Sequence, residues 1–113
     1  MNGKNDKVAI SVSGKIIYVN HNDIAYCNAN GNYTNIYFAN GNKELVSKKI
    51  KEVEKGIDNN NFIRVHNSYL VNKNQIKEFI KSDGTYLVLH SGKTIPVSRS
   101  KKAALLELLG NPL

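Results

Sequence analysis

Glycine-containing turns divide this chain into short segments, and they constrain its fold more than any other feature of the sequence. Asn-Gly, Asp-Gly and Ser-Gly pairs at 40–41, 83–84 and 91–92 separate runs rich in Val, Ile, Tyr and Phe. Such pairs suit tight hairpin turns, because they accept backbone angles that most residues avoid. The pattern therefore predicts a mainly antiparallel β domain rather than a series of parallel strand–helix units.

The runs between these turns have the length and composition of strands. In the clearest run, Tyr33, Asn35 and Tyr37 would share one face, because successive side chains of a strand point to opposite sides. Residues 1–7 are expected to form a polar tail or linker, 8–110 the domain and 111–113 a C-terminal tail. Strands are expected at 15–20, 25–29, 33–38, 44–46, 62–65, 76–81, 86–89 and 94–97.

Two segments change from the strand period to the helical one. Ile50, Val53 and Ile57 would lie on one face of a helix over 47–57, with Ser47 as its N-cap. A closing helix is expected after Ser98, which would cap it, and Gly110 would end it. The apolar face of that closing helix would comprise Ala103, Leu105, Leu106, Leu108 and Leu109.

Length and composition indicate a single domain. A chain of 113 residues and 12.6 kDa is long enough for one core and too short for two. Eighteen apolar residues never run together, so no membrane-spanning helix is expected, and the first residues lack the apolar region of a secretory signal. A cytoplasmic location is therefore expected.

The sequence contains no recognisable catalytic or metal-binding motif. Cys27 stands alone, which excludes an internal disulfide and a cysteine-based zinc site, and it has no basic neighbour that would favour a thiolate. His21, His66 and His90 are scattered and match no zinc motif. We therefore expect Cys27 to be a plain buried thiol, and we expect neither enzymatic activity nor a cofactor.

Positive charge is the main indication of a partner. The chain has 16 Lys and Arg against 9 Asp and Glu, and residues 61–113 hold eight of these cations but only three of the acids. Both expected helices begin with cations, within 48–51 and within 99–102, although a helix N-terminus favours negative charge. An external anion would reverse that preference. The alternative is a solvated, lysine-rich surface, since all but two of the 16 are lysine.

The segment FIRVHNSYLVN, residues 62–72, places three adjacent polar side chains between two apolar stretches. His66, Asn67 and Ser68 cannot all be buried without partners, because each unsatisfied group costs about 1–3 kcal/mol. One interpretation is a turn in which Asn and Ser bond the local backbone. The other is a tip, rooted on both sides, that projects an asparagine able to pair with adenine. Arg99, at the expected strand-to-helix junction, could bind guanine or a phosphate.

FIRVHNSYLVN and the later GKTIPVSRS together resemble the LytTR family of DNA-binding domains. DIAYCNANGNYTNIYF is similar to the opening strands of that family and SKKIKEVEKGI to its internal helix, so the resemblance covers residues 8 to 109. It implies an elongated, mainly β fold of small stacked sheets with two short helices. Loops of this fold would enter successive major grooves of double-stranded DNA and bend it. Such domains usually form the output half of bacterial response regulators, which implies a receiver domain outside these residues.

Matched by position, the resemblance also implies contact residues. Base contacts would come from Asn67, Arg99 and Tyr33. Phosphate contacts would come from His66, Ser68, Ser100, Lys101, Lys102, Asn32 and Lys48. A homodimer on repeated DNA sites is one arrangement that we consider.

Two other functions remain open at the level of the sequence. A single-stranded RNA or DNA binder could use the six tyrosines as stacking platforms on a sheet. A protein-interaction β module could owe its basic character to lysine abundance alone. Competition between duplex and single-stranded oligonucleotides separates the first from duplex binding. The second predicts that substitution of Asn67 or Arg99 leaves nucleic-acid binding unchanged.

Overall fold

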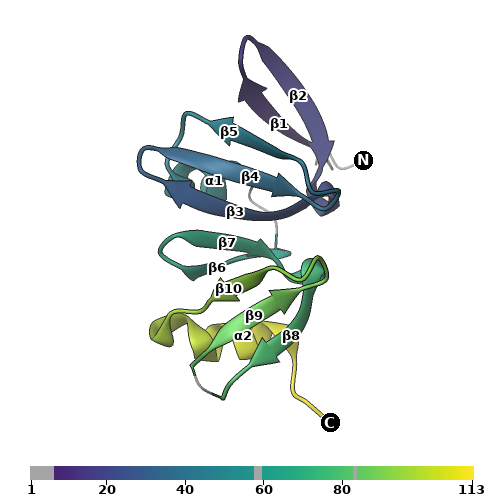
Figure 1. The fold of residues 1–113 in the computed structure, drawn as a ribbon, viewed down its shortest axis with the longest axis vertical. Coiled ribbons are helices and arrows are strands. Elements are labelled where there is room, and N and C mark those ends of the chain that lie inside the picture. The colour runs from purple at the N-terminus through teal and green to yellow at the C-terminus, as the bar shows by residue number, and fades with distance from the viewer. Residues whose placement is uncertain (1–6, 58–59, 83) are drawn as a thin grey trace.

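The structure is a computed structural model that describes residues 7–57, 60–82 and 84–113. Within these ranges the chain forms ten strands, two α-helices and three short 3-10 helices (Figure 1). The helices are η1 (His21–Asp23), α1 (Ile50–Ile57), η2 (Lys73–Gln75), η3 (Arg99–Lys101) and α2 (Lys102–Leu109). The strands are β1 (Lys7–Val12), β2 (Lys15–Asn20), β3 (Ile24–Asn30), β4 (Tyr33–Phe38), β5 (Lys43–Val46), β6 (Phe62–His66), β7 (Tyr69–Asn72), β8 (Ile76–Ile80), β9 (Tyr86–Leu89) and β10 (Thr94–Pro96).

The strands form three sheets that follow one another along the molecule. A central sheet has the order β5-β4-β3-β7-β6, with the hairpin β1-β2 on one side and the sheet β10-β9-β8 on the other (Figure 1). All the strand pairs are antiparallel. The molecule measures 44 × 37 × 24 Å. The expected mainly antiparallel fold of small stacked sheets with two short helices is confirmed.

The central sheet separates two hydrophobic cores, because its side chains alternate between its two faces. In β7, for example, Leu70 packs in the first core and Val71 in the second. The first core lies toward β1 and α1, and the second lies toward β9, β10 and α2. The first contains Ile10, Val12, Ile24, Cys27, Ile36, Val46, Ile50, Val53, Ile57 and Leu70. The second contains Ala25, Tyr26, Val65, Val71, Leu87, Leu89, Ile95, Val97 and Leu105.

The two fully buried polar residues of the described ranges both have partners. Asn72 donates from Nδ2 to the Ile24 carbonyl at 3.0 Å and accepts from the Asn74 amide at 3.0 Å. Thr34 donates from Oγ1 to the Lys48 carbonyl at 2.7 Å. Each bond avoids the cost of an unsatisfied buried group. The bond from Thr34 also holds the segment before α1 against the start of β4.

The first helix is shorter than predicted. It begins at Ile50, and the amides of Glu52 and Val53 bond the Lys49 carbonyl. The expectation that Ser47 is its N-cap is therefore wrong. The Lys49 amide instead donates to Oε1 of Glu52 at 3.4 Å, as in the second half of a capping box. Ile50, Val53 and Ile57 form the buried face of α1, as their spacing predicts.

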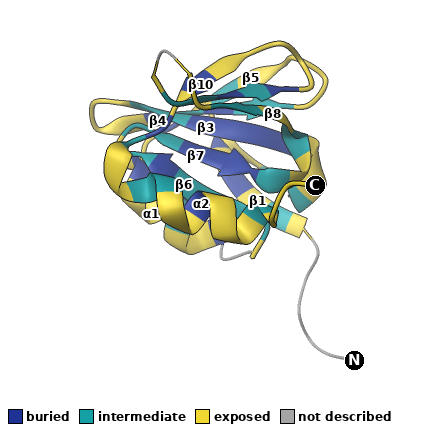
Figure 2. Cartoon of the chain, turned by 90° about the horizontal axis from the view of Figure 1, so that it is seen from below, coloured by how far each residue is buried: buried dark blue, intermediate teal, exposed yellow. Residues whose placement is uncertain are grey.

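The closing helix differs from prediction at its start and on its apolar face. Ser98 precedes the 3-10 helix η3 rather than α2, and its side chain makes no capping hydrogen bond. Leu105 is the buried residue of α2, whereas Leu106 and Leu108 are each 37% exposed. Figure 2 shows α2 largely exposed, whereas β3 and β7 are mainly buried. The apolar residues of α2 are thus spread around the helix, and only part of the set meets the second core.

The first described residues form a strand that is not among those expected from the sequence, although a Ser-Gly pair follows it at 13–14. β1 pairs with β2 along its whole length, from Lys7 opposite Asn20 to Val12 opposite Lys15. Lys7 of the expected tail belongs to this strand, and residues 1–6 lie outside the described ranges. Asp83 of the expected Asp-Gly turn is also outside them. No helix among the described residues is long and apolar enough to cross a membrane.

Candidate nucleic-acid interface

Three polar segments that are distant in sequence lie along one edge of the molecule. They are the β3–β4 turn, the β6–β7 turn and the stretch from β10 into α2, which follow one another down the left side of Figure 1. The Ala29 amide donates to the Ser68 carbonyl at 2.9 Å, and the Ser98 amide donates to the Val65 carbonyl at 2.8 Å. We call residues 31–33, 66–68 and 98–102, together with Lys48 beside Thr34, the loop edge.

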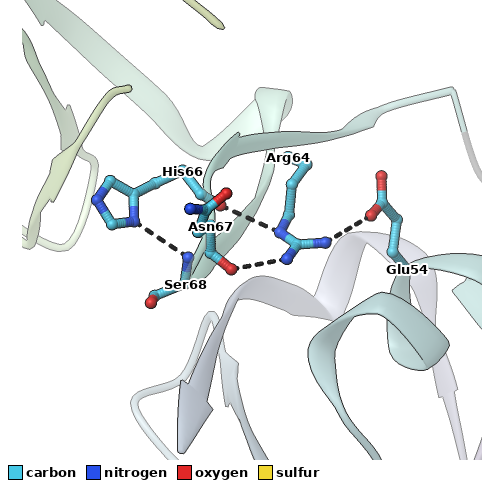
Figure 3. A network of polar contacts seen from close by, with 5 residues as sticks. All are labelled: Glu54, Arg64, His66, Asn67 and Ser68. Atoms are coloured by element: carbon cyan, nitrogen blue, oxygen red, sulfur yellow. Dashed lines mark hydrogen bonds and ion pairs between the residues drawn. The ribbon is translucent and has the colours of Figure 1, made fainter. Parts of the chain in front are cut away.

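The β6–β7 turn is fixed by hydrogen bonds at each of its residues (Figure 3). The Arg64 guanidinium donates from Nε to the His66 carbonyl at 3.1 Å and from Nη2 to the Asn67 carbonyl at 2.7 Å. The Ser68 amide donates to Nδ1 of His66 at 3.0 Å. The Asn67 side chain is exposed and makes no hydrogen bond within the described part of the chain. The structure favours the second interpretation, because the asparagine points outward; a local turn does form, but the side chains that bond its backbone are those of Arg64 and His66 rather than Asn67 or Ser68.

A β-bulge at the end of β6 connects this turn to residues 98–102, which we call the closing segment. Arg64 pairs with Leu70 and His66 pairs with Tyr69, so Val65 has no counterpart on β7. The Val65 side chain is fully buried in the second core, and its carbonyl accepts the Ser98 amide. A bulge redirects the backbone of a strand. Here it places the β6–β7 turn directly beside the start of η3.

The structure brings all ten residues of the predicted contact set to the loop edge. The Arg99 side chain is exposed and makes no hydrogen bond or ion pair within the described ranges, so it is not part of a structural salt bridge there. Tyr33 is 48% exposed. His66, Ser68, Lys101 and Lys102 are half-buried, and Asn32, Tyr33, Lys48, Asn67, Arg99 and Ser100 are exposed. Whether each side chain contacts a base or a phosphate stays a prediction.

The ring of His66 has one nitrogen engaged inside the turn. Its Nδ1 accepts the Ser68 amide, so in the neutral ring the proton lies on Nε2. The ring packs against that of Tyr69 in a T-shaped arrangement, with the ring centroids 5.8 Å apart. A neutral His66 can therefore donate a hydrogen bond from Nε2 while it still stabilises the turn.

The cations at the two helix starts do not have the same setting. Lys48 and Lys49 precede α1, and Glu52 supplies a negative charge in its first turn. An external anion is therefore less strongly favoured at α1, because the helix provides its own carboxylate. The first turns of η3, which begins at Arg99, and of α2 contain no acidic residue. A negatively charged partner is better supported at this second site.

Arg64 is a residue whose role the sequence pattern did not indicate. Apart from its two bonds to the β6–β7 turn, it donates from Nη1 to Oε1 of Glu54 in α1, at 2.9 Å (Figure 3). In sequence it is one charge among the apolar residues of a strand. The available signal was its place two residues before the polar tip, on the opposite strand face from Val65.

Cys27 and Tyr26 are buried groups that do not belong to the loop edge. Burial raises the pKa of the Cys27 thiol to about 12, so the expectation of an inert buried thiol is confirmed. Burial also raises the pKa of Tyr26 to about 12, and the neighbouring Tyr37 adds to that effect. Among the described residues, no group of three or more His, Cys, Asp and Glu side chains could hold a metal ion.

Comparison with solved structures shows the same fold in a known domain. The LytTr DNA-binding domain of a putative methyl-accepting/DNA response regulator from Bacillus cereus matches 96% of this chain and 100% of its own, with a TM-score of 0.78. Its sequence is 24% identical to this one.

Sequence comparison links the chain to bacterial regulators that are more than twice as long. The sensory transduction protein LytT of Bacillus subtilis (strain 168) is 35% identical over 105 residues, which is 91% of this chain and 43% of LytT. The heme-containing CO-sensing transcriptional regulator RcoM 1 of Paraburkholderia xenovorans (strain LB400) is 30% identical over 107 residues, or 92% of this chain and 40% of RcoM 1. The family model of the LytTr DNA-binding domain matches residues 14–110. The chain therefore belongs to the LytTR family of DNA-binding domains.

Proposed function

We propose that this domain binds specific sequences of double-stranded DNA through its loop edge and thereby regulates transcription. The observation that carries the proposal is the alignment of three outward-facing polar segments along one edge. A duplex lying along that edge would meet all three. Residues 31–33, 66–68 and 98–102 would approach it together, and the adjoining cations would face its phosphates.

The side chains on the loop edge suit different parts of a duplex. The amide of Asn67 can pair with N6 and N7 of adenine, and the fork of Arg99 can bind O6 and N7 of guanine. Tyr33 is the third candidate for base contact. The phosphate contacts would use the remaining polar residues: His66 through Nε2, and Ser68, Ser100, Lys101, Lys102, Asn32 and Lys48.

The dimensions of the molecule are compatible with contact to more than one groove. Neighbouring strands lie about 4.8 Å apart, so the β3–β4 and β6–β7 turns are separated by roughly 10 Å. The long axis of 44 Å exceeds the roughly 34 Å repeat of the duplex. A bend of the DNA toward the edge would bring successive major grooves closer to the tips, and the added contacts would offset the energy of bending.

The lengths of the relatives suggest how the domain is used. This chain spans less than half of the length of LytT and RcoM 1, which are a sensory transduction protein and a transcriptional regulator. We propose that the domain acts as the output part of a response regulator in the cytoplasm, coupled to a receiver domain outside these residues. Two copies would occupy repeated DNA sites as a homodimer.

Selection from a random duplex library is the direct test. The chain should enrich a preferred sequence and bind it at least a thousandfold more tightly than random duplex, with log K falling steeply against log salt concentration. Asn67→Ala and Arg99→Ala should each cost about 1–3 kcal/mol and relax the preference at one base position. No enriched sequence, together with affinity that ignores salt, would exclude the proposal. An equal loss on every sequence would assign Arg99 to phosphate.

The single-stranded alternative is less well supported by the aromatic side chains. Tyr26 and Tyr37 stack on each other with centroids 4.5 Å apart, and Tyr69 packs at 6.3 Å from Tyr26. These rings serve packing between the sheets, and Tyr33 is the exposed ring of the loop edge. If single-stranded oligonucleotides outcompete the selected duplex, the alternative is correct.

A further inference from the structure

Arg64 is engaged by the protein on three sides, unlike the exposed Arg99. Its fork donates to the carbonyls of His66 and Asn67 and to the carboxylate of Glu54, and its side chain is 20% exposed (Figure 3). We propose that Arg64 is a positioning residue, which fixes the backbone beneath the Asn67 side chain and does not itself contact DNA. This inference rests on the proposed function of the loop edge.

The conformation of the turn explains why it needs such support. Two-residue hairpin turns usually take primed conformations, which require positive φ angles. Neither Asn67 nor Ser68 has a positive φ. The adjoining strand is also interrupted by the bulge at Val65. The planar guanidinium of Arg64 spans the two successive carbonyls, and its fixed geometry suits this task better than a lysine would.

Glu54 completes the arrangement from α1. Its side chain is 42% exposed, so its ion pair with Arg64 adds little to the stability of the fold. Its effect is instead on the orientation and the charge of the Arg64 guanidinium. It holds the guanidinium from the side opposite the turn, and it neutralises a cation that could otherwise turn toward a phosphate. A positioning role for Arg64 therefore fits the contacts better than a direct electrostatic one.

The first experiment compares the selected duplex with a random duplex of equal length. Arg64→Lys keeps the charge but loses the planar fork, so we expect about a tenfold loss on the selected duplex, with the random-duplex affinity and the salt slope unchanged. Lys51→Met, an exposed cation on α1, is the matched control and should change neither affinity by as much as about threefold. If Arg64 instead contacts a phosphate, Arg64→Lys will bind normally and Arg64→Met will lower both affinities and reduce the salt slope by about 1.

A double-mutant cycle separates positioning from general destabilisation. In an Asn67→Ala background, Arg64→Lys should cost less than about twofold more on the selected duplex, because the side chain that it positions is absent. A full additional tenfold loss would overturn the inference. Asn67→Ala alone reports on the proposed function: if it binds normally, both ideas fail. If it weakens binding while Arg64→Lys does not, only the positioning role fails.

Glu54→Gln provides a second variant that keeps an acceptor oxygen. We expect a smaller loss than with Arg64→Lys, about threefold, confined to the selected duplex. A gain in affinity for the random duplex would contradict the inference, because it would mean that the released cation binds phosphate. Urea unfolding of each variant, read before the binding assay, sets conditions in which all the proteins are fully folded.

Discussion

The β6–β7 turn and the closing segment lie side by side on the loop edge, yet they are held differently. In the turn, Arg64 binds the carbonyls of His66 and Asn67, and Ser68 is bonded through both its amide and its carbonyl. In the closing segment, backbone bonds start from the amides of Ser98 and Lys101. The exposed side chains of Arg99 and Ser100 make no hydrogen bond within the described ranges.

This difference corresponds to the length of the side chain that each segment carries. Asparagine is short, so its amide reaches a base edge only if the backbone is accurately placed beforehand. Arginine is long, so its guanidinium can reach a partner from several rotamers. Binding then fixes one rotamer, at a free-energy cost of up to about 2 kcal/mol. We infer that the backbone of the turn is already in position before DNA binds, whereas the Arg99 side chain of the closing segment becomes ordered only when it contacts DNA.

The largest expected effect concerns the helix behind the closing segment. Leu105 is fully buried in the second core, so Leu105→Ala should lower the free energy of unfolding by about 2–5 kcal/mol. Leu106→Ala, at a residue that is 37% exposed, is the matched control and should cost less than about 1 kcal/mol. Urea unfolding measures both. Equal losses would mean that α2 does not pack as described and that Arg99 lacks a rigid base.

An intermediate effect would test the rigidity of the turn directly. Asn67→Gln adds one methylene, and a fixed backbone cannot withdraw to accommodate it. We therefore expect nearly the whole loss of Asn67→Ala, about 1–3 kcal/mol, in binding to the selected duplex. Arg99→Lys should keep part of its binding energy, because a long cation can still reach a phosphate. If Asn67→Gln binds like wild type, the turn is not rigid and the contrast between the two segments disappears.

The smallest expected effect tests whether the lysines of the closing segment contribute general attraction to phosphates or sequence recognition. Lys101→Ala and Lys102→Ala should each reduce the slope of log K against log salt by about 1, equally on the selected and random duplexes. Lys77→Ala, an exposed cation on β8 next to η2, is the control and should leave the slope unchanged. A loss confined to the selected duplex would instead make these lysines part of sequence recognition.

Much of the fold follows from short-range signals. Hairpins were predicted at the glycine turns, and the buried face of α1 was predicted from Ile50, Val53 and Ile57. The prediction failed for Ser47, because Glu52 supplies the side-chain contact at the start of that helix. It failed for β1, although a Ser-Gly pair at 13–14, of the same kind as the pair at 91–92, joins β1 to β2.

The sequence by itself determined the class of fold, the family and the two polar segments that carry Asn67 and Arg99, because turn chemistry and side-chain period are local properties. Only the tertiary structure decided that these segments adjoin. The bulge at Val65 and its bond to Ser98 join residues more than thirty positions apart. The contact between Arg64 and Glu54 arose in the same way, since α1 and β6 meet only when the first core packs against the central sheet.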